Sequence, residues 1–335
     1  MKVLMLTTGW PTQKNPNSSP FIYRQYIFLK KHGVDVDVFH LQSNHNPFNY
    51  LMGWIKVRKL IWKNSYNIIH AQWGHSATLA IPTKLPLVIT FRGMDLEGIV
   101  NKKGNYSIYG KLLITISKFT SYFANEIVVV SKNLGDKLKD KNYKILPSGI
   151  NLDLFKPLDK LECRKKLGLP DNKKLILFTA DPNHPRKRFH LAKQSVKLLK
   201  DKIDCELIIC TNQSHEDVVL FMNAADCLIL TSATEGSPNV VKEALACNLS
   251  VVSTQVGDVE ERKGSLNHFE ICDSRPEEIS NALFKVLSTK NEINNRKSVL
   301  HLDENVITSK LIEIYHKAIN ENLRNTKTNN GNNGV

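Results

Sequence analysis

The chain has 335 residues, of which 41% are hydrophobic, so it is long enough for two domains with buried cores. Lysine and arginine outnumber aspartate and glutamate by 20 to 8 in residues 1–153, but only by 26 to 24 in residues 154–335. This basic first half predicts an anionic partner such as phospholipid headgroups, a diphosphate-linked acceptor or nucleic acid. A lysine-rich composition without a partner would give the same excess.

No apolar run reaches the length of about eighteen residues that a membrane-spanning helix needs. The first residues lack a small-residue cleavage site and predict a buried strand instead of a signal peptide. The six cysteines contain no C-x-x-C pair, which is typical of reduced core thiols in a cytoplasmic protein.

Short apolar runs and amphipathic helices alternate along the first half, which predicts a Rossmann-like unit. The expected strands are 2–8, 34–40, 68–74, 87–91, 126–130 and 144–146, and the expected helices begin near 21 and cover 48–64 and 111–123. The second strand holds Asp35 and Asp37, formally a D-x-D metal pattern. Their place at the entry to a buried strand favours two hydrogen-bonded or solvated carboxylates instead.

The helix expected at 48–64 carries Lys56, Lys59 and Lys63 on one face and tryptophans on others. Such a helix can lie on an anionic membrane surface. An ordinary helix that covers the sheet explains the same pattern and is the preferred interpretation.

Polar side chains stand at the ends of two neighbouring strands, where ligands bind in open α/β sheets. His70 ends one strand, and Arg92 follows the other, three residues before Asp95. Arg92 can hold a phosphate or carboxylate through two hydrogen bonds, and Asp95 is a weaker candidate for positioning an acceptor. For His70, a direct role and a core histidine bonded to backbone are equally compatible with the sequence.

The second half repeats the alternation of strands and helices. Strands are expected at 174–179, 205–210, 226–230 and 249–253, and helices through 199 and over 215–224, 275–288 and 305–320. Arg186, Lys187 and Arg188 precede a helix that follows the first of these strands. Three cations at a helix N-terminus oppose the helix dipole, so an anion there would stabilise them, although charge runs are commonly just solvated.

The densest pattern is Glu235-Gly-Ser-Pro-Asn-Val-Val-Lys-Glu243, between the last two of these strands. Ser237 is a suitable N-cap and Pro238 suits the first position of a helix. The N–H groups of Gly236 to Val240 would then be available to an anion or to sugar oxygens.

This stretch resembles the E-x7-E signature of retaining nucleotide-sugar glycosyltransferases of family 4, which have the GT-B fold. Pro147-Ser-Gly-Ile-Asn151 is similar to a segment that joins the two domains in that family, and Arg92 stands where many members carry histidine. The resemblance covers the whole chain. It implies two facing Rossmann-like domains with a cleft between them: residues 1–153 on the acceptor side and 154–304 on the donor side. The helix near 305–320 would return to the first domain, and the tail 325–335 is expected to be disordered.

The resemblance implies transfer of a sugar, with retention, from a nucleoside-diphosphate donor to a growing, lipid-linked bacterial surface glycan. It places Glu243 on the donor ribose and Glu235 at the donor sugar, with Lys187 and Arg186 neutralising the diphosphate. The predicted site also contains His70 and Arg92 as catalytic candidates, and Ser148, Gly149, Gly236, Ser237, Pro238, Asn239 and Val240 as donor contacts. These cations would replace a metal, so no metal or cofactor is expected.

The expected location is the cytoplasm, with contact to the cytoplasmic face of the inner membrane through the basic first half as a further candidate. Alternatives are a sugar-nucleotide epimerase or phosphorylase of the same fold. A nucleic-acid-binding protein is disfavoured, because aromatic residues interleaved with cations on a sheet are not evident.

Overall fold

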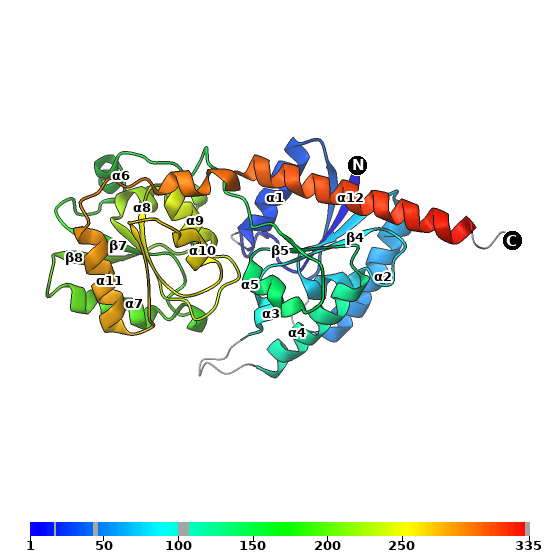
Figure 1. Cartoon of the computed structure of the whole chain (residues 1–335), viewed down its shortest axis with the longest axis horizontal. Coiled ribbons are helices and arrows are strands. Elements are labelled where there is room, and N and C mark those ends of the chain that lie inside the picture. The colour runs from blue at the N-terminus through cyan, green and yellow to red at the C-terminus, as the bar shows by residue number, and fades with distance from the viewer. Residues whose placement is uncertain (17, 43–45, 100–106, 332–335) are drawn as a thin grey trace. The chain divides into compact units, whose positions relative to one another are not determined.

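A computed structural model describes residues 1–16, 18–42, 46–99 and 107–331 of the chain. They form two compact units (Figure 1). The first unit comprises Met1–Val100, Asn105–Gly149 and Glu304–Val335, and the second contains Ile150–Asp303. The second unit is therefore an insertion in the chain of the first.

The first unit is built on a six-stranded parallel sheet of order β2-β1-β3-β4-β5-β6. The strands are β1 Lys2–Thr7, β2 Asp35–His40, β3 Ile68–Ala71, β4 Leu87–Phe91, β5 Glu126–Val129 and β6 Lys144–Ile145. The helices are α1 Pro20–Lys31, α2 Pro47–Lys63, η1 Gly74–Leu79, α3 Met94–Glu97, α4 Ile108–Thr120, η2 Ser121–Phe123, α5 Lys132–Gly135, η3 Asp136–Leu138 and α12 Glu304–Gly331. The central strands are fully buried, as expected for parallel strands covered by helices on both faces. In Figure 1, α12 runs above this sheet, whereas α2 and α4 lie below it and pack against η1.

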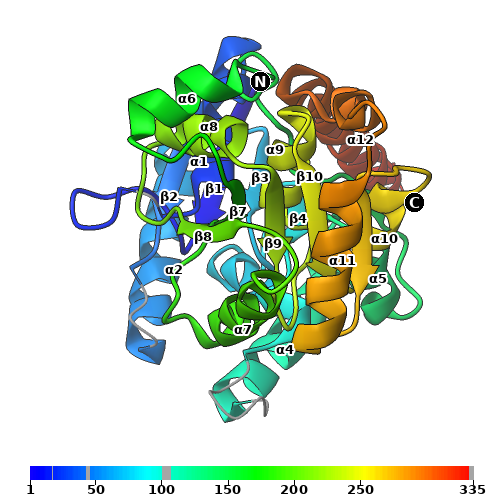
Figure 2. The same cartoon turned by 90° about the vertical axis from the view of Figure 1, so that its left-hand side faces the viewer.

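The second unit has a five-stranded parallel sheet of order β11-β10-β9-β7-β8 (Figure 2). The strands are β7 Lys174–Phe178, β8 Cys205–Ile209, β9 Cys227–Leu230, β10 Ser250–Thr254 and β11 Phe269–Cys272. The helices are α6 Lys160–Leu167, η4 Pro185–Lys187, α7 Phe189–Leu199, α8 His215–Ala224, α9 Asn239–Ala246, α10 Val259–Lys263, α11 Pro276–Ser288 and η5 Asn295–Leu302. The strand order reverses at β7, because β8 lies on one side of it and β9 on the other. Loops that follow β7 and β9 therefore flank a topological switch point, the usual ligand position in such sheets.

The parallel α/β prediction is confirmed for both units, and most differences concern element ends. Helix α4 begins at Ile108 instead of residue 111, because the Ser107 side chain accepts a hydrogen bond from the Gly110 N–H and caps it. The amino-terminal part of the first unit extends to Gly149, whereas the sequence places this boundary at residue 153.

The expected disorder of the tail is wrong for its described part. Helix α12 continues from Glu304 to Gly331, and residues 332–335 lie outside the described residues. Extending an existing helix costs far less than starting one, so a polar segment without proline can continue it.

Within the described part of the chain, no helix is both long and apolar enough to cross a membrane. The six cysteines are free thiols, and all but Cys272 are buried. Burial raises the pKa of the Cys210 and Cys247 thiols to about 12, so these groups are neutral at physiological pH.

Candidate functional site

Two loops of the second unit are joined at the switch point, the one after β7 and the one after β9. Arg188 donates from Nε to the Thr231 carbonyl at 2.7 Å and from Nη2 to the Ser232 carbonyl at 2.7 Å. In return, the Thr231 hydroxyl donates to the Lys187 carbonyl at 2.7 Å, and the Ala233 N–H to the Arg186 carbonyl at 2.8 Å. Arg188 adopts a left-handed conformation, with φ of 47°. The Arg188 side chain therefore holds the two loops together.

These joined loops bring three residues of the predicted site into contact. The Lys187 Nζ lies 2.6 Å from Glu235 Oε1, and the Arg186 Nη1 lies 3.5 Å from Glu235 Oε2. The Ser232 hydroxyl donates to Glu235 Oε1 at 2.8 Å. The Glu235 side chain is only 10% exposed, so this cluster holds two cations around one nearly buried carboxylate.

The environment of Glu235 decides its charge. Burial on its own would raise the pKa of this carboxyl, but Lys187, Arg186 and the hydrogen bonds from Lys187 and Ser232 outweigh it. The pKa of Glu235 therefore lies below its ordinary value. At neutral pH the residue is ionised and cannot donate a proton.

The segment after Glu235 leads into α9, which begins one residue later than predicted. Asn239 is its first residue and Pro238 is the cap. The predicted N-cap role of Ser237 is wrong, because its hydroxyl donates to Asp258 Oδ2 at 2.8 Å instead. The first N–H groups of α9, those of Asn239 and Val240, have no acceptor within the helix. The Asn239 Oδ1 is buried without a partner in the structure.

A third loop, which follows β10, packs against the segment after Glu235 through Gly257 and Asp258. The sequence did not predict this contact. Arg262 donates to Asp258 Oδ2 at 2.8 Å from Nη2, while the other oxygen of this buried carboxylate has no partner in the structure. Gly257 has φ of 55°, and a Cβ there would lie 2.8 Å from the Gly236 carbonyl oxygen. A glycine turn after the strand is visible in the sequence, but its contact with Gly236 depends on the tertiary fold.

Glu243 lies in the second turn of α9 and is 9% exposed. It is thus separated from Glu235 by the loop and the first turn of the helix. Both carboxylates belong to the segment that connects β9 to β10, on the carboxyl side of the second sheet.

In the first unit, His70 is a core residue. It is 0% exposed, its Nδ1 lies 2.6 Å from Tyr315 Oη, and its Nε2 lies 2.8 Å from Thr90 Oγ1. Burial, and secondarily Arg92, lowers the pKa of His70 to about 3. This environment fits a core histidine, although its partners are the side-chain hydroxyls of Tyr315 and Thr90 instead of the backbone groups expected from the sequence.

Arg92 is held in place by neutral side chains. Its Nε donates to Gln72 Oε1 at 3.0 Å and its Nη1 to Ser148 Oγ at 3.0 Å, and its guanidinium lies 5.0 Å from the Phe21 ring centroid. Burial lowers the pKa of Arg92 to about 10, so it remains charged. Asp95 is fully buried and accepts the N–H groups of Gly93 and Gly74, which indicates a structural role in shaping this strand end.

The predicted donor contacts Ser148 and Gly149 belong to the first unit. Ser148 accepts from Arg92, and the Gly149 carbonyl accepts from Arg24 Nη2 at 3.3 Å. A Cβ on Gly149 would lie 2.8 Å from the Glu304 Cα, so the glycine permits close approach of the start of α12. The structure gives both residues partners within their own unit.

The D-x-D pattern forms a local ion pair. The Lys2 Nζ lies 3.1 Å from Asp37 Oδ2, which also accepts from Tyr66 Oη at 2.7 Å. The bond from Tyr66 is the main cause of a lowered pKa of Asp37. Among the described residues, no group of three or more histidine, cysteine or acidic side chains is placed to hold a metal ion.

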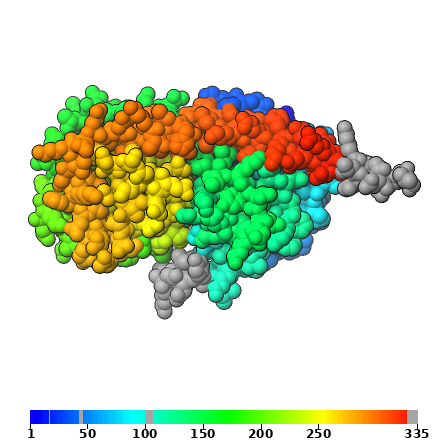
Figure 3. Space-filling view, in the orientation of Figure 1, coloured from blue at the N-terminus to red at the C-terminus, as the bar shows by residue number. Residues whose placement is uncertain are grey.

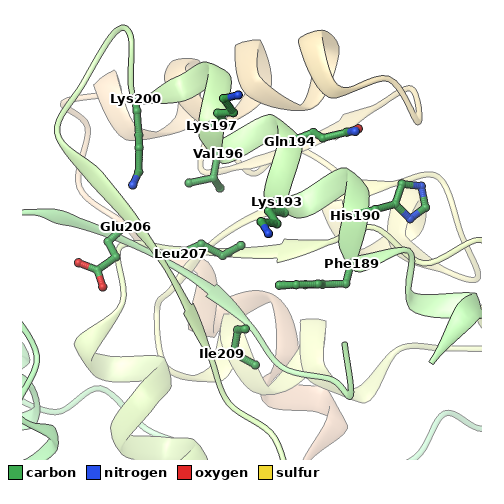
Figure 4. Close-up of a pocket in the computed structure, with 10 residues that line it drawn as sticks. All are labelled: Phe189, His190, Lys193, Gln194, Val196, Lys197, Lys200, Glu206, Leu207 and Ile209. Carbon is green, nitrogen blue, oxygen red and sulfur yellow. The ribbon is translucent and has the colours of Figure 1, made fainter. Parts of the chain in front are cut away.

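A separate hollow of about 810 Å³ lies between α7 and the edge strand β8 (Figure 4). Lys193 and Lys197 of α7 and Leu207 and Ile209 of β8 contribute to its lining. In the commonest doubly wound order a further strand would continue the sheet beyond this edge. The connection from β8 to α8 is too short for one, and Glu235 and its partners do not line this hollow.

Comparison with known proteins agrees with this architecture. Residues 3–154 match the model described as Glycosyltransferase Family 4, and residues 174–289 match the model described as Glycosyl transferases group 1. Together these matches span the sheets of both units.

Two relatives are each 24% identical to this chain. One is TuaC of Bacillus subtilis, named as a glycosyltransferase of teichuronic acid biosynthesis, with 84% of this chain and 88% of the relative aligned. The other is the N,N'-diacetylbacillosaminyl-diphospho-undecaprenol alpha-1,3-N-acetylgalactosaminyltransferase of Campylobacter jejuni, with 87% of this chain and 88% of the relative aligned.

Solved structures share the fold. Sucrose-phosphate synthase from Thermosynechococcus elongatus matches with a TM-score of 0.80 at 15% identity over 94% of this chain and 98% of that one. HepE from Anabaena, in complex with UDP and glucose, matches with a TM-score of 0.71 at 16% identity over 93% and 98%. The fold class is thus GT-B, with two parallel α/β units. The family models and the fold agree with the E-x7-E segment, and the chain belongs to the group 1, or family 4, glycosyltransferases.

Proposed function

We propose that this glycosyltransferase moves a hexose-type sugar, with retention, from a nucleoside-diphosphate donor to a lipid-linked glycan of the bacterial cell surface. The reaction needs stabilisation of the negative charge that develops on the diphosphate as it leaves. The observation that carries the proposal is the cluster of Lys187 and Arg186 around Glu235, at the switch point of the second sheet.

The two cations suit the diphosphate. Lys187 is 19% exposed and Arg186 is 26% exposed, so both side chains are largely desolvated yet reachable by a ligand. One carboxylate balances only one of them, and the Arg186 Nε is buried without a partner in the structure. A diphosphate would satisfy this excess charge, helped by the N–H groups at the start of α9.

Glu235 would orient Lys187 and accept a hydrogen bond from a hydroxyl group of the donor sugar. Its lowered pKa keeps it ionised, which suits an acceptor of hydrogen bonds and not a general acid. The leaving phosphate would take the proton of the acceptor hydroxyl, so no carboxylate nucleophile is required. Glu243 would bind the donor ribose. The chemistry needs no divalent ion in this scheme, since the cations neutralise the leaving group.

The acceptor class is supported by the relatives. The name of the Campylobacter jejuni enzyme specifies a diphospho-undecaprenol acceptor, and TuaC is named for a cell-surface polymer. The positive excess of residues 1–153 fits an acceptor that carries a diphosphate, at the cytoplasmic face of the membrane.

A thermal-shift panel of nucleoside-diphosphate sugars tests this function. A matching donor at about 100 times its Kd should stabilise the folded protein by about 2.7 kcal/mol. NMR of the product made from that donor with a lipid-diphosphate acceptor should show the donor's anomeric configuration. Stabilisation by no nucleotide sugar, or release of a rearranged nucleotide sugar without transfer to the acceptor, would contradict the proposal.

A further inference from the structure

The outer faces of α2 and α4 combine apolar and cationic side chains on the same side of the first unit. On α4 and η2 the exposed residues recur at helical spacing and form what we call the α4 stripe. It consists of Ile108, Lys111, Leu112, Lys118, Phe119 and Tyr122. Ile108 is 89% exposed and Tyr122 is 71% exposed. A solvent-facing helix surface normally carries polar residues, so this stripe needs a partner.

Helix α2 presents the same composition. Trp62 is 85% exposed and Phe48 is 61% exposed, and Lys56, Lys59 and Lys63 of the same helix are exposed as well. Trp54 is turned inward, since its Nε1 donates to the Ile81 carbonyl at 2.9 Å. The helix therefore covers the sheet with one face and still exposes an apolar and basic face.

The two helices border one apolar groove of about 280 Å³. Pro47 and Tyr50 of α2 line one side, and Leu112 and Ile116 of α4 line the other. The groove connects the two helices, with Leu112 of the α4 stripe in its lining, and Figure 3 shows α4 at the surface of the first unit.

The charge of this surface selects the partner. Neither α2 nor the segment 108–123 contains an aspartate or glutamate. At the end of α4, Lys118, Lys139 and Lys141 line a small hollow of about 150 Å³, with the Lys141 Nζ 3.4 Å from the Tyr122 ring centroid. Apolar side chains next to cations, with no acidic residue on either helix, match a lipid surface with anionic headgroups.

We propose that the outer faces of α2 and α4 dock the protein on an anionic phospholipid bilayer. The lysines would contact headgroup phosphates, and the exposed aromatic and aliphatic side chains would enter the boundary between headgroups and acyl chains. The inference rests on the proposed function, because a lipid-linked acceptor would be met at such a surface. It goes further by naming the surface and its partner.

Sedimentation of the full chain with vesicles tests this inference. We expect binding to phosphatidylglycerol vesicles that weakens with salt, and little binding to phosphatidylcholine vesicles. Each lysine near an anionic surface contributes about a fivefold change in partitioning, so Lys111→Gln with Lys118→Gln should reduce binding about 25-fold. Replacing Phe119 and Tyr122 by serine should also reduce binding, and should do so at high salt.

A matched control removes equal charge from elsewhere. Lys165→Gln with Lys166→Gln, both exposed on α6 of the second unit, should leave vesicle binding nearly unchanged. An equal loss in both lysine pairs, absence of binding, or a dimer that buries the stripe in solution would overturn the proposal. The thermal shift produced by UDP or by the matching nucleotide sugar reports the donor site alone. A protein that keeps this shift but ignores anionic vesicles would refute the docking surface and leave the proposed reaction intact.

Discussion

Replacement of Lys187 by alanine tests the charge cluster most directly. In the native protein its ammonium group lies 2.6 Å from a carboxylate that is 10% exposed. The variant leaves Glu235 with Arg186 at 3.5 Å and the hydroxyl of Ser232 at 2.8 Å. The carboxylate thus loses its nearest counter-charge but keeps two partners.

Two separate effects should follow. Removing one partner of a buried ion pair costs about 3–5 kcal/mol when nothing replaces it. Because Arg186 and Ser232 remain, we expect a loss of stability of about 1–2 kcal/mol for Lys187→Ala. Removing one preorganised group that stabilises developing charge lowers turnover by about 10²–10³-fold. The pKa of Glu235 should rise at the same time.

The assay is turnover with the matching donor, together with unfolding by urea. Glu235→Gln in the Lys187→Ala background should recover most of the stability, because the buried charge is gone, but not the turnover. Lys193→Ala, an exposed lysine of α7, is the matched control and should change neither quantity. Loss of a charge-stabilising group is expected to lower turnover at least about 10²-fold. Turnover of Lys187→Ala within about threefold of the wild type would therefore refute the role of this lysine.

Other predictions concern separate parts of the molecule. Glu243→Ala should weaken donor affinity at least tenfold while the unfolding midpoint stays close to wild type, as titration calorimetry with the donor can check; unchanged affinity would remove it from the ribose site. Gly257→Ala should cost about 1–3 kcal/mol, because φ of 55° strains alanine and its Cβ would press on the carbonyl of Gly236; a variant as stable as wild type would contradict this contact. The pKa of His70 is about 3 in the folded protein and near 6.5 in the unfolded chain, so the unfolded chain binds the proton more tightly. The contribution of His70 to the free energy of unfolding is therefore complete above pH 6.5 and is lost as the pH falls toward 3. Stability should fall by up to about 1.4 kcal/mol per pH unit in that window, and less steeply in His70→Gln. Addition of EDTA should leave turnover unchanged, and strong inhibition reversed by a divalent cation would overturn the metal-free scheme.

The sequence predicted the fold well, because its signals are local. Parallel strands such as 87–91 are continuous apolar runs, and helices show their periodic faces. The family resemblance implied that Lys187 and Glu235 serve the same site, and the structure shows why they meet: both loops leave the same edge of the sheet at its switch point.

What the sequence could not predict depends on partners far along the chain. His70 bonds to Tyr315, which is remote in sequence, so its core role is visible only in the folded protein. Likewise, Ser237 looked like a helix cap until the structure placed Asp258 beside its hydroxyl. The α4 stripe escaped notice because an apolar helix face predicts burial, and exposure is decided by the neighbouring elements.

The return of α12 to the first unit has a consequence for biosynthesis. Residues 150–303 leave the ribosome as a continuous segment, whereas the first unit must wait for residues after 303 before Tyr315 can bury itself beside His70. We therefore expect the inserted unit to reach its native state earlier during translation, and the amino-terminal sheet to stay incompletely covered until the last helix emerges. A released chain that is truncated after residue 303 should accordingly show protease resistance in the middle of the sequence and sensitivity at its beginning.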